Sequence, residues 1–130
     1  MKTPNSDIAQ RYLKAIYQKD YETANNLLAE NITLTMNGNN KLSGIRIGKP
    51  AFFEAFERMM QLTQFSYKMI DEIEWLEGHS RALLLAVETA TKNNVSYHFN
   101  RAIDYQIQDG KIQAIKIYEG EPVTVDLIFS

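Results

Sequence analysis

A few ionisable side chains of this sequence are candidates for acid–base chemistry inside an apolar pocket. They are Asp71, His98, Asp104 and Glu119. A carboxyl or imidazole group withdrawn from water acquires a shifted pKa and can then take or give a proton near neutral pH. His98 and Asp104 lie on one strand, and six residues of strand separate them by about 20 Å. These two residues are therefore not a catalytic dyad.

Arg101 belongs to a second set of polar residues. In a regular antiparallel pairing of the strands concerned, Glu88 is its diagonal neighbour and Tyr118 lies directly opposite. A buried arginine needs a charged partner, because an unpaired guanidinium is costly to remove from water. We interpret this cluster as an ion pair that supports a subunit interface. Binding of a ligand by Arg101 is the alternative.

The two histidines do not indicate a metal site. His79 falls in a turn and His98 on a half-polar strand, and no third residue has metal-ligand spacing. The chain contains no cysteine, which excludes thiolate chemistry, cysteine metal ligands and disulfides. We expect neither a metal nor a cofactor.

The first half of the chain supplies helices that would cover a sheet. A helix over residues 7–19 carries an apolar stripe that includes Tyr12, and Asp20 caps a second, shorter helix. Gly48-Lys49-Pro50 opens a third helix, since proline is tolerated in the first helical turn. Core packing is the usual role of large apolar side chains here, although the same residue types line pockets. They are Phe52, Phe56, Met59, Met60, Tyr67 and Trp75.

The second half of the chain predicts a sheet. Strand-like alternation begins at residues 32–36 and 42–47, and four long strands follow between Phe65 and Glu119. Tight turns join these four strands into an antiparallel meander. The turns are Glu77-Gly78-His79, Lys92-Asn93-Asn94 and Asp109-Gly110.

Register decides which side chains of the meander share a face. Two-residue loops pair Thr89 with His98, Leu83 with Asp104, and Asp104 with Ile115. The apolar pattern slips along the last two strands, which predicts a β-bulge near residues 103–104 or 113–114. Because both faces are largely apolar, we expect the face that the helices leave uncovered to pack against a second copy of the chain.

The tail over residues 121–130 also alternates. Val123, Val125, Leu127 and Phe129 are apolar at every second position. This spacing predicts an edge strand or a segment that crosses to a partner subunit.

Composition bounds the remaining possibilities. The 130 residues, 45% of them hydrophobic and 23% charged, suit one domain over residues 1–130. A formal charge of −2 with no basic run argues against nucleic acid as a partner. Residues 1–7 lack the apolar core of a secretory signal, and no apolar run approaches the ~20 residues that span a bilayer. We expect a cytoplasmic protein without a membrane partner.

The whole chain resembles the nuclear transport factor 2-like superfamily, which includes SnoaL-like polyketide cyclases and ketosteroid isomerase. The resemblance is carried by Lys19-Asp20 at the end of the first helix, by Gly44 and Gly48-Lys49-Pro50-Ala51, and by Asp109-Gly110-Lys111-Ile112 leading to Tyr118-Glu119. It implies an α+β cystatin-like cone: three N-terminal helices packed on a strongly curved antiparallel sheet. It also implies an apolar pocket and a homodimer formed through the sheet face.

The local likeness to ketosteroid isomerase suggests roles for individual residues. Gln10-Arg11-Tyr12 resembles the segment with the tyrosine that donates to the developing oxyanion, and Ile103-Asp104 resembles the dipeptide with the second, neutral acid. Tyr12 and Asp104 are therefore the catalytic candidates. The aspartate that serves as general base aligns with Met36, and methionine cannot accept a proton.

From these observations we predict a small-molecule-binding domain with an apolar pocket between the first helix, the third helix and the sheet. Its partner would be a small apolar or aromatic molecule. An enzyme of the cyclase, dehydratase or isomerase type is the alternative, and a non-catalytic dimeric interaction module is the second alternative. The predicted ligand-binding residues are Tyr12, Met36, Phe56, Trp75, Arg101, Asp104, Tyr118 and Glu119.

Overall fold

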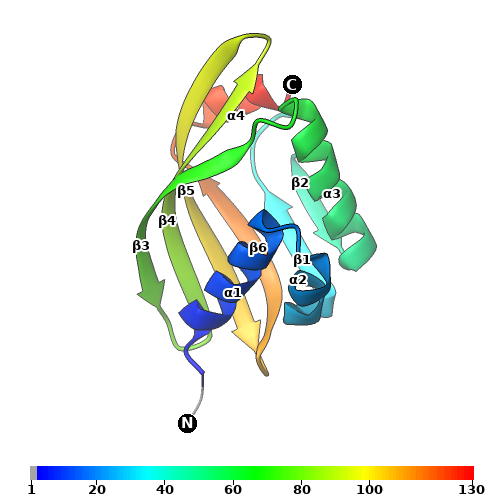
Figure 1. Ribbon diagram of the computed structural model, residues 1–130, viewed down its shortest axis with the longest axis vertical. Helices are drawn as coiled ribbons and strands as arrows, with labels where there is room; N and C mark the ends of the chain where they lie inside the picture. The colour runs from blue at the N-terminus through cyan, green and yellow to red at the C-terminus, as the bar shows by residue number, and fades with distance from the viewer. Residues whose placement is uncertain (1–2) are drawn as a thin grey trace.

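The computed structural model describes residues 3–130; Met1 and Lys2, the start of the N-terminal segment considered above, lie outside the described residues. It is an α+β fold in which helices pack on a six-stranded sheet (Figure 1). In chain order the elements are α1 (Asn5–Tyr17), α2 (Tyr21–Leu27), β1 (Leu28–Met36), β2 (Gly44–Ile47), α3 (Lys49–Leu62), β3 (Lys68–Glu77), β4 (Arg81–Lys92), β5 (Val95–Gln108), β6 (Lys111–Glu119) and α4 (Pro122–Ile128).

The sheet has the strand order β2-β1-β6-β5-β4-β3. Strands β3 to β6 form the predicted antiparallel meander. The prediction of a wholly antiparallel sheet is wrong for one pair of neighbouring strands, because β1 runs parallel to β6. The two strands are distant in sequence, and a parallel neighbour needs a long connection, which α3 and the meander provide.

Two tight turns set the register of the long strands. Asn93 and Asn94 have φ angles of 52° and 65°, and Asp109 and Gly110 have φ angles of 54° and 74°. Asparagine, aspartate and glycine tolerate this left-handed region, which two-residue hairpin loops require. The predicted pairs between β4 and β5, Thr89 with His98 and Leu83 with Asp104, are confirmed.

A β-bulge at Gln113 shifts the pairing between β5 and β6. Ile107 pairs with Ile112 and Gln106 pairs with Ala114, so Gln113 is the extra residue, at one of the two predicted places. Two predicted pairs are therefore wrong. Asp104 lies opposite Lys116 instead of Ile115, and Arg101 lies opposite Glu119 instead of Tyr118.

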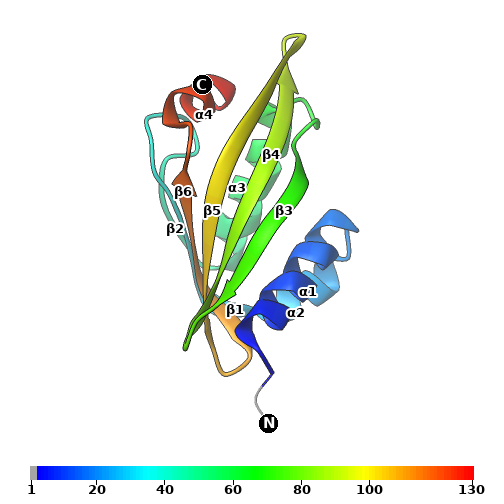
Figure 2. The same cartoon turned by 90° about the vertical axis from the view of Figure 1, so that its left-hand side faces the viewer.

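Helices α1 and α3 lie on the same face of the sheet, which we call the inner face (Figure 2). Helix α1 buries the apolar stripe seen in the sequence, including Ile8, Tyr12 and Ile16. The Glu77 carboxylate accepts hydrogen bonds from the main-chain N–H groups of Asn5 and Ser6, at 2.9 and 2.7 Å, and so satisfies free donors of the first turn. The sheet thereby fixes the position of α1.

The C-terminal segment is a helix, and the predicted strand is wrong. Helix α4 buries Val125 and Ile128, which are three residues apart, and Phe129 beyond its end is buried as well. Its start fits Pro122 in the first turn. Lys92 donates a hydrogen bond from Nζ to the Ile128 carbonyl at 2.8 Å. The tail thus closes one end of the domain.

No helix among residues 3–130 has the length and apolar character of a membrane span.

Candidate functional site

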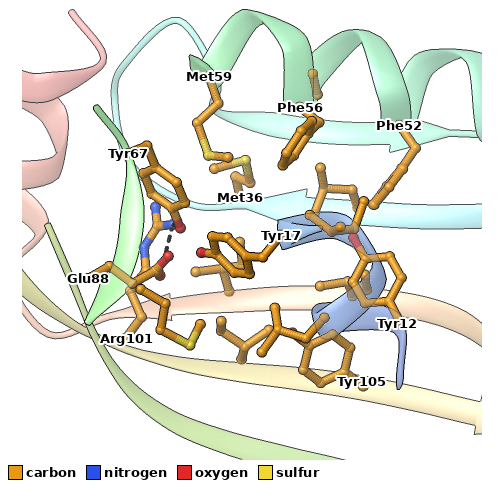
Figure 3. Close-up of a pocket in the computed structure, with 18 residues that line it drawn as sticks. Tyr12, Tyr17, Met36, Phe52, Phe56, Met59, Tyr67, Glu88, Arg101 and Tyr105 are labelled. Atoms are coloured by element: carbon orange, nitrogen blue, oxygen red, sulfur yellow. Dashed lines mark hydrogen bonds and ion pairs between the residues drawn. The ribbon is translucent and has the colours of Figure 1, made fainter. Parts of the chain in front are cut away.

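A small cavity of about 80 Å³ lies between α1, α3 and the inner face of the sheet (Figure 3). Its walls are mostly apolar. Met36 and Ile117 contribute from β1 and β6, and Met59 from α3. Six aromatic residues also line it: Tyr12, Tyr17, Phe52, Phe56, Tyr67 and Tyr105. The cavity is therefore suited to apolar or aromatic groups.

Glu88 is the carboxyl group that lines this cavity. Strand β4 alternates, so that Glu88 shares the buried inner face with Ala86 and Ala90, and its exposed fraction is 1%. Its Oε1 lies 3.4 Å from Nη1 of Arg101, whereas its Oε2 has no hydrogen-bond partner. Burial, with a further contribution from Glu119, raises the pKa of Glu88 to about 7, although Arg101 opposes the shift.

Arg101 is held mainly by Glu119. Nε and Nη2 of Arg101 donate to the two carboxylate oxygens of Glu119 at 2.7 and 2.6 Å, and Nη1 donates to the Tyr67 hydroxyl at 3.1 Å. The guanidinium carbon also lies 5.2 Å from the Phe99 ring centre and 5.7 Å from that of Phe129. Every edge of this arginine is thus engaged by the protein itself.

The charges of Arg101, Glu88 and Glu119 do not balance one another. Burial alone would lower the pKa of Arg101, but Glu88 and Glu119 outweigh that effect and raise it. The arginine therefore carries one positive charge, and with both carboxyls ionised the cluster has a net negative charge. Glu119 makes the shorter, two-pronged ion pair, so the uncompensated charge lies mainly on Glu88.

Two tyrosines of α1 contribute differently. The Tyr12 ring is buried and meets Phe52 and Tyr105 edge-on, with ring centres 6.3 and 6.1 Å away. Tyr17 stands at the mouth with 42% of its surface exposed, but its hydroxyl is turned inward toward Glu88 (Figure 3). Burial of that hydroxyl and the charge of Glu88 raise the pKa of Tyr17. Tyr17 thus turns a neutral hydroxyl toward the carboxyl.

A larger groove of about 980 Å³ adjoins the cavity. It is lined from α1, α2, α3 and the segment that leads to β3, including Phe53, Met60 and Phe65. Ile16, Tyr17, Phe56 and Tyr67 line both the cavity and the groove. These four side chains lie between the inner cavity and the groove.

The structure brings together four of the eight predicted ligand-binding residues. Tyr12, Met36, Phe56 and Arg101 line the cavity. Glu119 does not line it, and contacts Arg101. The predicted ion pair between Arg101 and Glu88 is present, but both side chains are buried on the inner face, inside the domain, and not on the face predicted to meet a second copy.

Three predicted residues lie elsewhere. Trp75 stacks on Tyr105, with ring centres 5.9 Å apart, and does not line the cavity. Asp104 points to the opposite, outer face of the sheet, where its Oδ2 accepts from Nη1 of Arg81 at 2.8 Å. Tyr118 is on that outer face too, 44% exposed. The bulge at Gln113 is the cause for Tyr118, because one extra residue turns a side chain to the other face.

The sequence reasoning missed Glu88 as a candidate acid or base, and it missed Tyr17. Asp71 and His98, which it considered, are exposed. The sequence signal for Glu88 was its position in the strand: it lies two residues after Ala86 and four residues after Leu84, and both of these side chains are buried. Every second residue of a strand faces the same way, so a carboxyl within that series lies on the buried face.

The described part of the chain holds no group of three or more His, Asp or Glu side chains that could bind a metal ion. No protein-family model matches the sequence, and no curated protein matches it either.

Solved structures do resemble the fold. A protein of unknown function with a cystatin-like fold from Xanthomonas campestris superposes with a TM-score of 0.92 at 18% identity, over 98% of this chain and 99% of that chain. TerC, co-crystallized with polyporic acid, gives a TM-score of 0.84 at 13% identity, over 98% and 100% of the two chains. A proposed polyketide cyclase from Pseudomonas putida KT2440 gives 0.73 at 16%, over 96% and 98%.

Other matching structures are nuclear transport factor 2-like proteins, from Burkholderia xenovorans and Anabaena variabilis among others. At these low identities the likeness establishes the fold. The chain has the cystatin-like α+β fold of nuclear transport factor 2-like proteins.

Proposed function

We propose that this chain is a cone-fold small-molecule-binding domain, and that its ligand is an apolar or aromatic molecule with one polar group that reaches Glu88. The observation that carries the proposal is the buried, unpartnered Oε2 of Glu88 in a mostly apolar cavity. A buried polar atom without a partner is costly, and a donor on a ligand would supply the missing hydrogen bond.

The two spaces suggest how such a ligand would be accommodated. A cavity of about 80 Å³ holds a small group only, whereas the adjoining groove of about 980 Å³ has room for a ring system. The polar group would enter the cavity, and the apolar body would lie against Phe56 and the neighbouring rings. TerC, which has a similar fold, was co-crystallized with a small molecule, polyporic acid, and this supports a small-molecule ligand.

A neutral aromatic probe tests the proposal. We expect 1-naphthol to bind at micromolar to millimolar concentration in ligand-observed NMR or calorimetry. Ala55→Leu should weaken binding because Ala55 lines the cavity, whereas the same change at Ala102 on the outer face should not. Both variants are first checked for a cooperative thermal transition. No binding to the wild-type chain, or equal loss in both variants, would contradict the proposal.

One observation favours an acid–base enzyme as a second candidate. Glu88 has a pKa raised to about 7 and is buried among mostly apolar side chains, so it could take a proton from a substrate and return it near neutral pH. The cyclase, dehydratase and isomerase reactions all require such a transfer. Turnover of a ketosteroid that is lost in Glu88→Gln would support this candidate. Turnover that survives the substitution would exclude Glu88 as the base.

We also propose that the outer face of the sheet pairs with a second copy of the chain. Leu83, Leu85 and Val87 form a half-buried apolar row there, and Oδ1 of the buried Asp104 has no partner. A partner subunit would cover the row and supply a donor. Sedimentation should give a dimer, and Leu85→Glu should give a monomer. A single wild-type species near 15.0 kDa would refute the dimer.

A further inference from the structure

We propose that the ligand is a cation: an apolar or aromatic amine whose ammonium group binds Glu88 inside the ring of aromatic side chains. This inference rests on the proposed binding function and narrows its ligand class.

The first argument for a cationic ligand is the balance of charges around Glu88. Glu119 occupies two edges of the Arg101 guanidinium at 2.7 and 2.6 Å, so only Nη1 remains for Glu88, and that contact is 3.4 Å long. Nη1 is also shared with the Tyr67 hydroxyl. The Glu88 carboxylate is thus only partly compensated, and a second positive charge would complete the pairing.

No other basic side chain of the described residues lines the cavity. The remaining titratable groups that line it are tyrosines: Tyr12 and Tyr17 on α1, Tyr67 before β3, and Tyr105 on β5. A neutral hydroxyl can donate one hydrogen bond to Glu88 but cannot balance its charge. An anionic ligand would meet Glu88 without a free cation to receive it, and is therefore disfavoured.

The second argument for a cationic ligand is the aromatic lining of the cavity. Tyr17, Phe56 and Tyr67 line both the cavity and the groove, and Tyr12 lines the cavity alone (Figure 3). The face of an aromatic ring is electron-rich and attracts an organic cation, most strongly where water is excluded. Rings together with one under-compensated carboxylate therefore favour an ammonium group over an alcohol of the same shape.

The groove adds a third, independent contribution. Its charged lining residues are Lys19, Glu22 and Glu57, which together carry a net negative charge. A positively charged ligand would be attracted to the entrance before it reached Glu88. Negative charge is thus present both at the groove, where a ligand would enter, and at Glu88, where its ammonium group would bind.

This arrangement predicts a pH dependence. The ammonium binds the ionised form of Glu88, so its affinity should rise as pH increases through the pKa of about 7, while an alkylamine stays protonated. Arg101 stays charged because Glu88 and Glu119 raise its pKa, and Tyr12, Tyr17 and Tyr105 stay neutral because burial raises the pKa of their hydroxyls. Glu88 is then the group that titrates.

Three probes with one ring system test the inference by calorimetry: 2-(1-naphthyl)ethylamine, 2-(1-naphthyl)ethanol and 1-naphthylacetate. At pH 8 the amine should bind about tenfold or more tightly than the alcohol, which corresponds to one added charge interaction in a partly buried site. The naphthylacetate anion should bind most weakly. Between pH 8 and pH 6 the affinity for the amine should fall up to about tenfold, while that for the alcohol stays nearly constant.

Variants identify the group responsible. Glu88→Gln should reduce the affinity for the amine to that for the alcohol and leave the latter nearly unchanged. Glu74→Gln, an exposed carboxyl on β3, is the matched control and should change neither. If the glutamine variant fails to fold, the wild-type pH profile decides the question.

The outcomes separate the two proposals. Equal or tighter binding of the alcohol overturns the cation inference and leaves the binding function standing. No binding of any probe overturns both. Selectivity for the amine that is unchanged in Glu88→Gln, or that does not vary between pH 6 and 8, places the cation elsewhere and overturns the inference.

Discussion

Glu88→Gln should change the pH dependence of folding stability. Folding raises the pKa of Glu88 from 4.5 to about 7, so the native chain binds this proton more tightly than the unfolded chain does. A raised acidic pKa contributes stability that is fully present below the unfolded value and is lost as pH rises toward the folded value. Glu88 should therefore destabilise the protein progressively between about pH 4.5 and pH 7.

The magnitude follows from the shift. Moving a carboxyl pKa from 4.5 to about 7 corresponds to about 3 kcal/mol, of which about 2–3 kcal/mol falls between pH 5 and pH 8. Glutamine has nearly the same shape and does not titrate in this range. The free energy of unfolding of Glu88→Gln, minus that of the wild type, should rise by this amount from pH 5 to pH 8.

Urea unfolding at pH 5, 6, 7 and 8 measures the difference. Taking the difference between variant and wild type cancels the titration of all other groups that the substitution leaves unperturbed. Glu74→Gln, an exposed carboxyl on β3, controls for the loss of a charge and should give a flat difference. A flat difference for Glu88→Gln as well would show that Glu88 is ionised as readily in the folded chain as in the unfolded one, and the buried-carboxyl reasoning would be wrong.

Three further substitutions test the surroundings of the site. Arg101→Met leaves Glu119 and Glu88 buried without their cation, and should lower the free energy of unfolding in urea by about 3–5 kcal/mol. Phe129→Ala removes a fully buried ring from beside Arg101 and should cost about 3–5 kcal/mol in the same assay. Tyr12→Phe should change the unfolding free energy by less than about 1 kcal/mol, because the described residues offer no hydrogen bond to the Tyr12 hydroxyl. A larger loss for Tyr12→Phe would reveal a polar partner, and a loss below about 1 kcal/mol for either of the other two would show that the Arg101 cluster adds little to stability.

The long hairpin of β4 and β5 could be predicted from the sequence because its turn is local. Two asparagines with positive φ leave one register for the strands beside them, and Thr89 and His98 are paired as expected. The pairing of β5 with β6 depended instead on where one extra residue was placed. The alternation of apolar residues narrowed the bulge to two sites, but only the packing of the whole sheet selects Gln113.

That single residue explains the main error about the site. Without the bulge, Tyr118 faces Arg101; with it, Glu119 does, and the arginine acquires a two-pronged ion pair in the interior. A shift of one residue moves every later side chain of a strand to the other face. Site residues beyond a bulge therefore cannot be placed from alternation alone.

The prediction of a strand over residues 121–130 was wrong for a different reason. Apolar residues at 123, 125, 127 and 129 fit a strand, but Val125, Ile128 and Phe129 equally fit one face of a helix. Seven residues are too few for either period to dominate. Burial of Phe129 against Arg101 accompanies the helix, and such a contact with a distant strand is not visible in local sequence.

Met36 and Glu88 show that the ionisable group of the cavity lies at a different position from the one that the resemblance to ketosteroid isomerase suggests. Resemblance to ketosteroid isomerase places the base at the end of β1, where Met36 makes that wall apolar. The same cavity nevertheless contains a carboxyl, supplied by β4 and held beside a guanidinium from β5. An apolar residue at one expected position therefore does not leave the cavity without an ionisable group. Glu88 lies beside Arg101, and the Tyr17 hydroxyl is turned toward it, so the polar end of the cavity is oriented differently; on our proposal, this end selects the ligand.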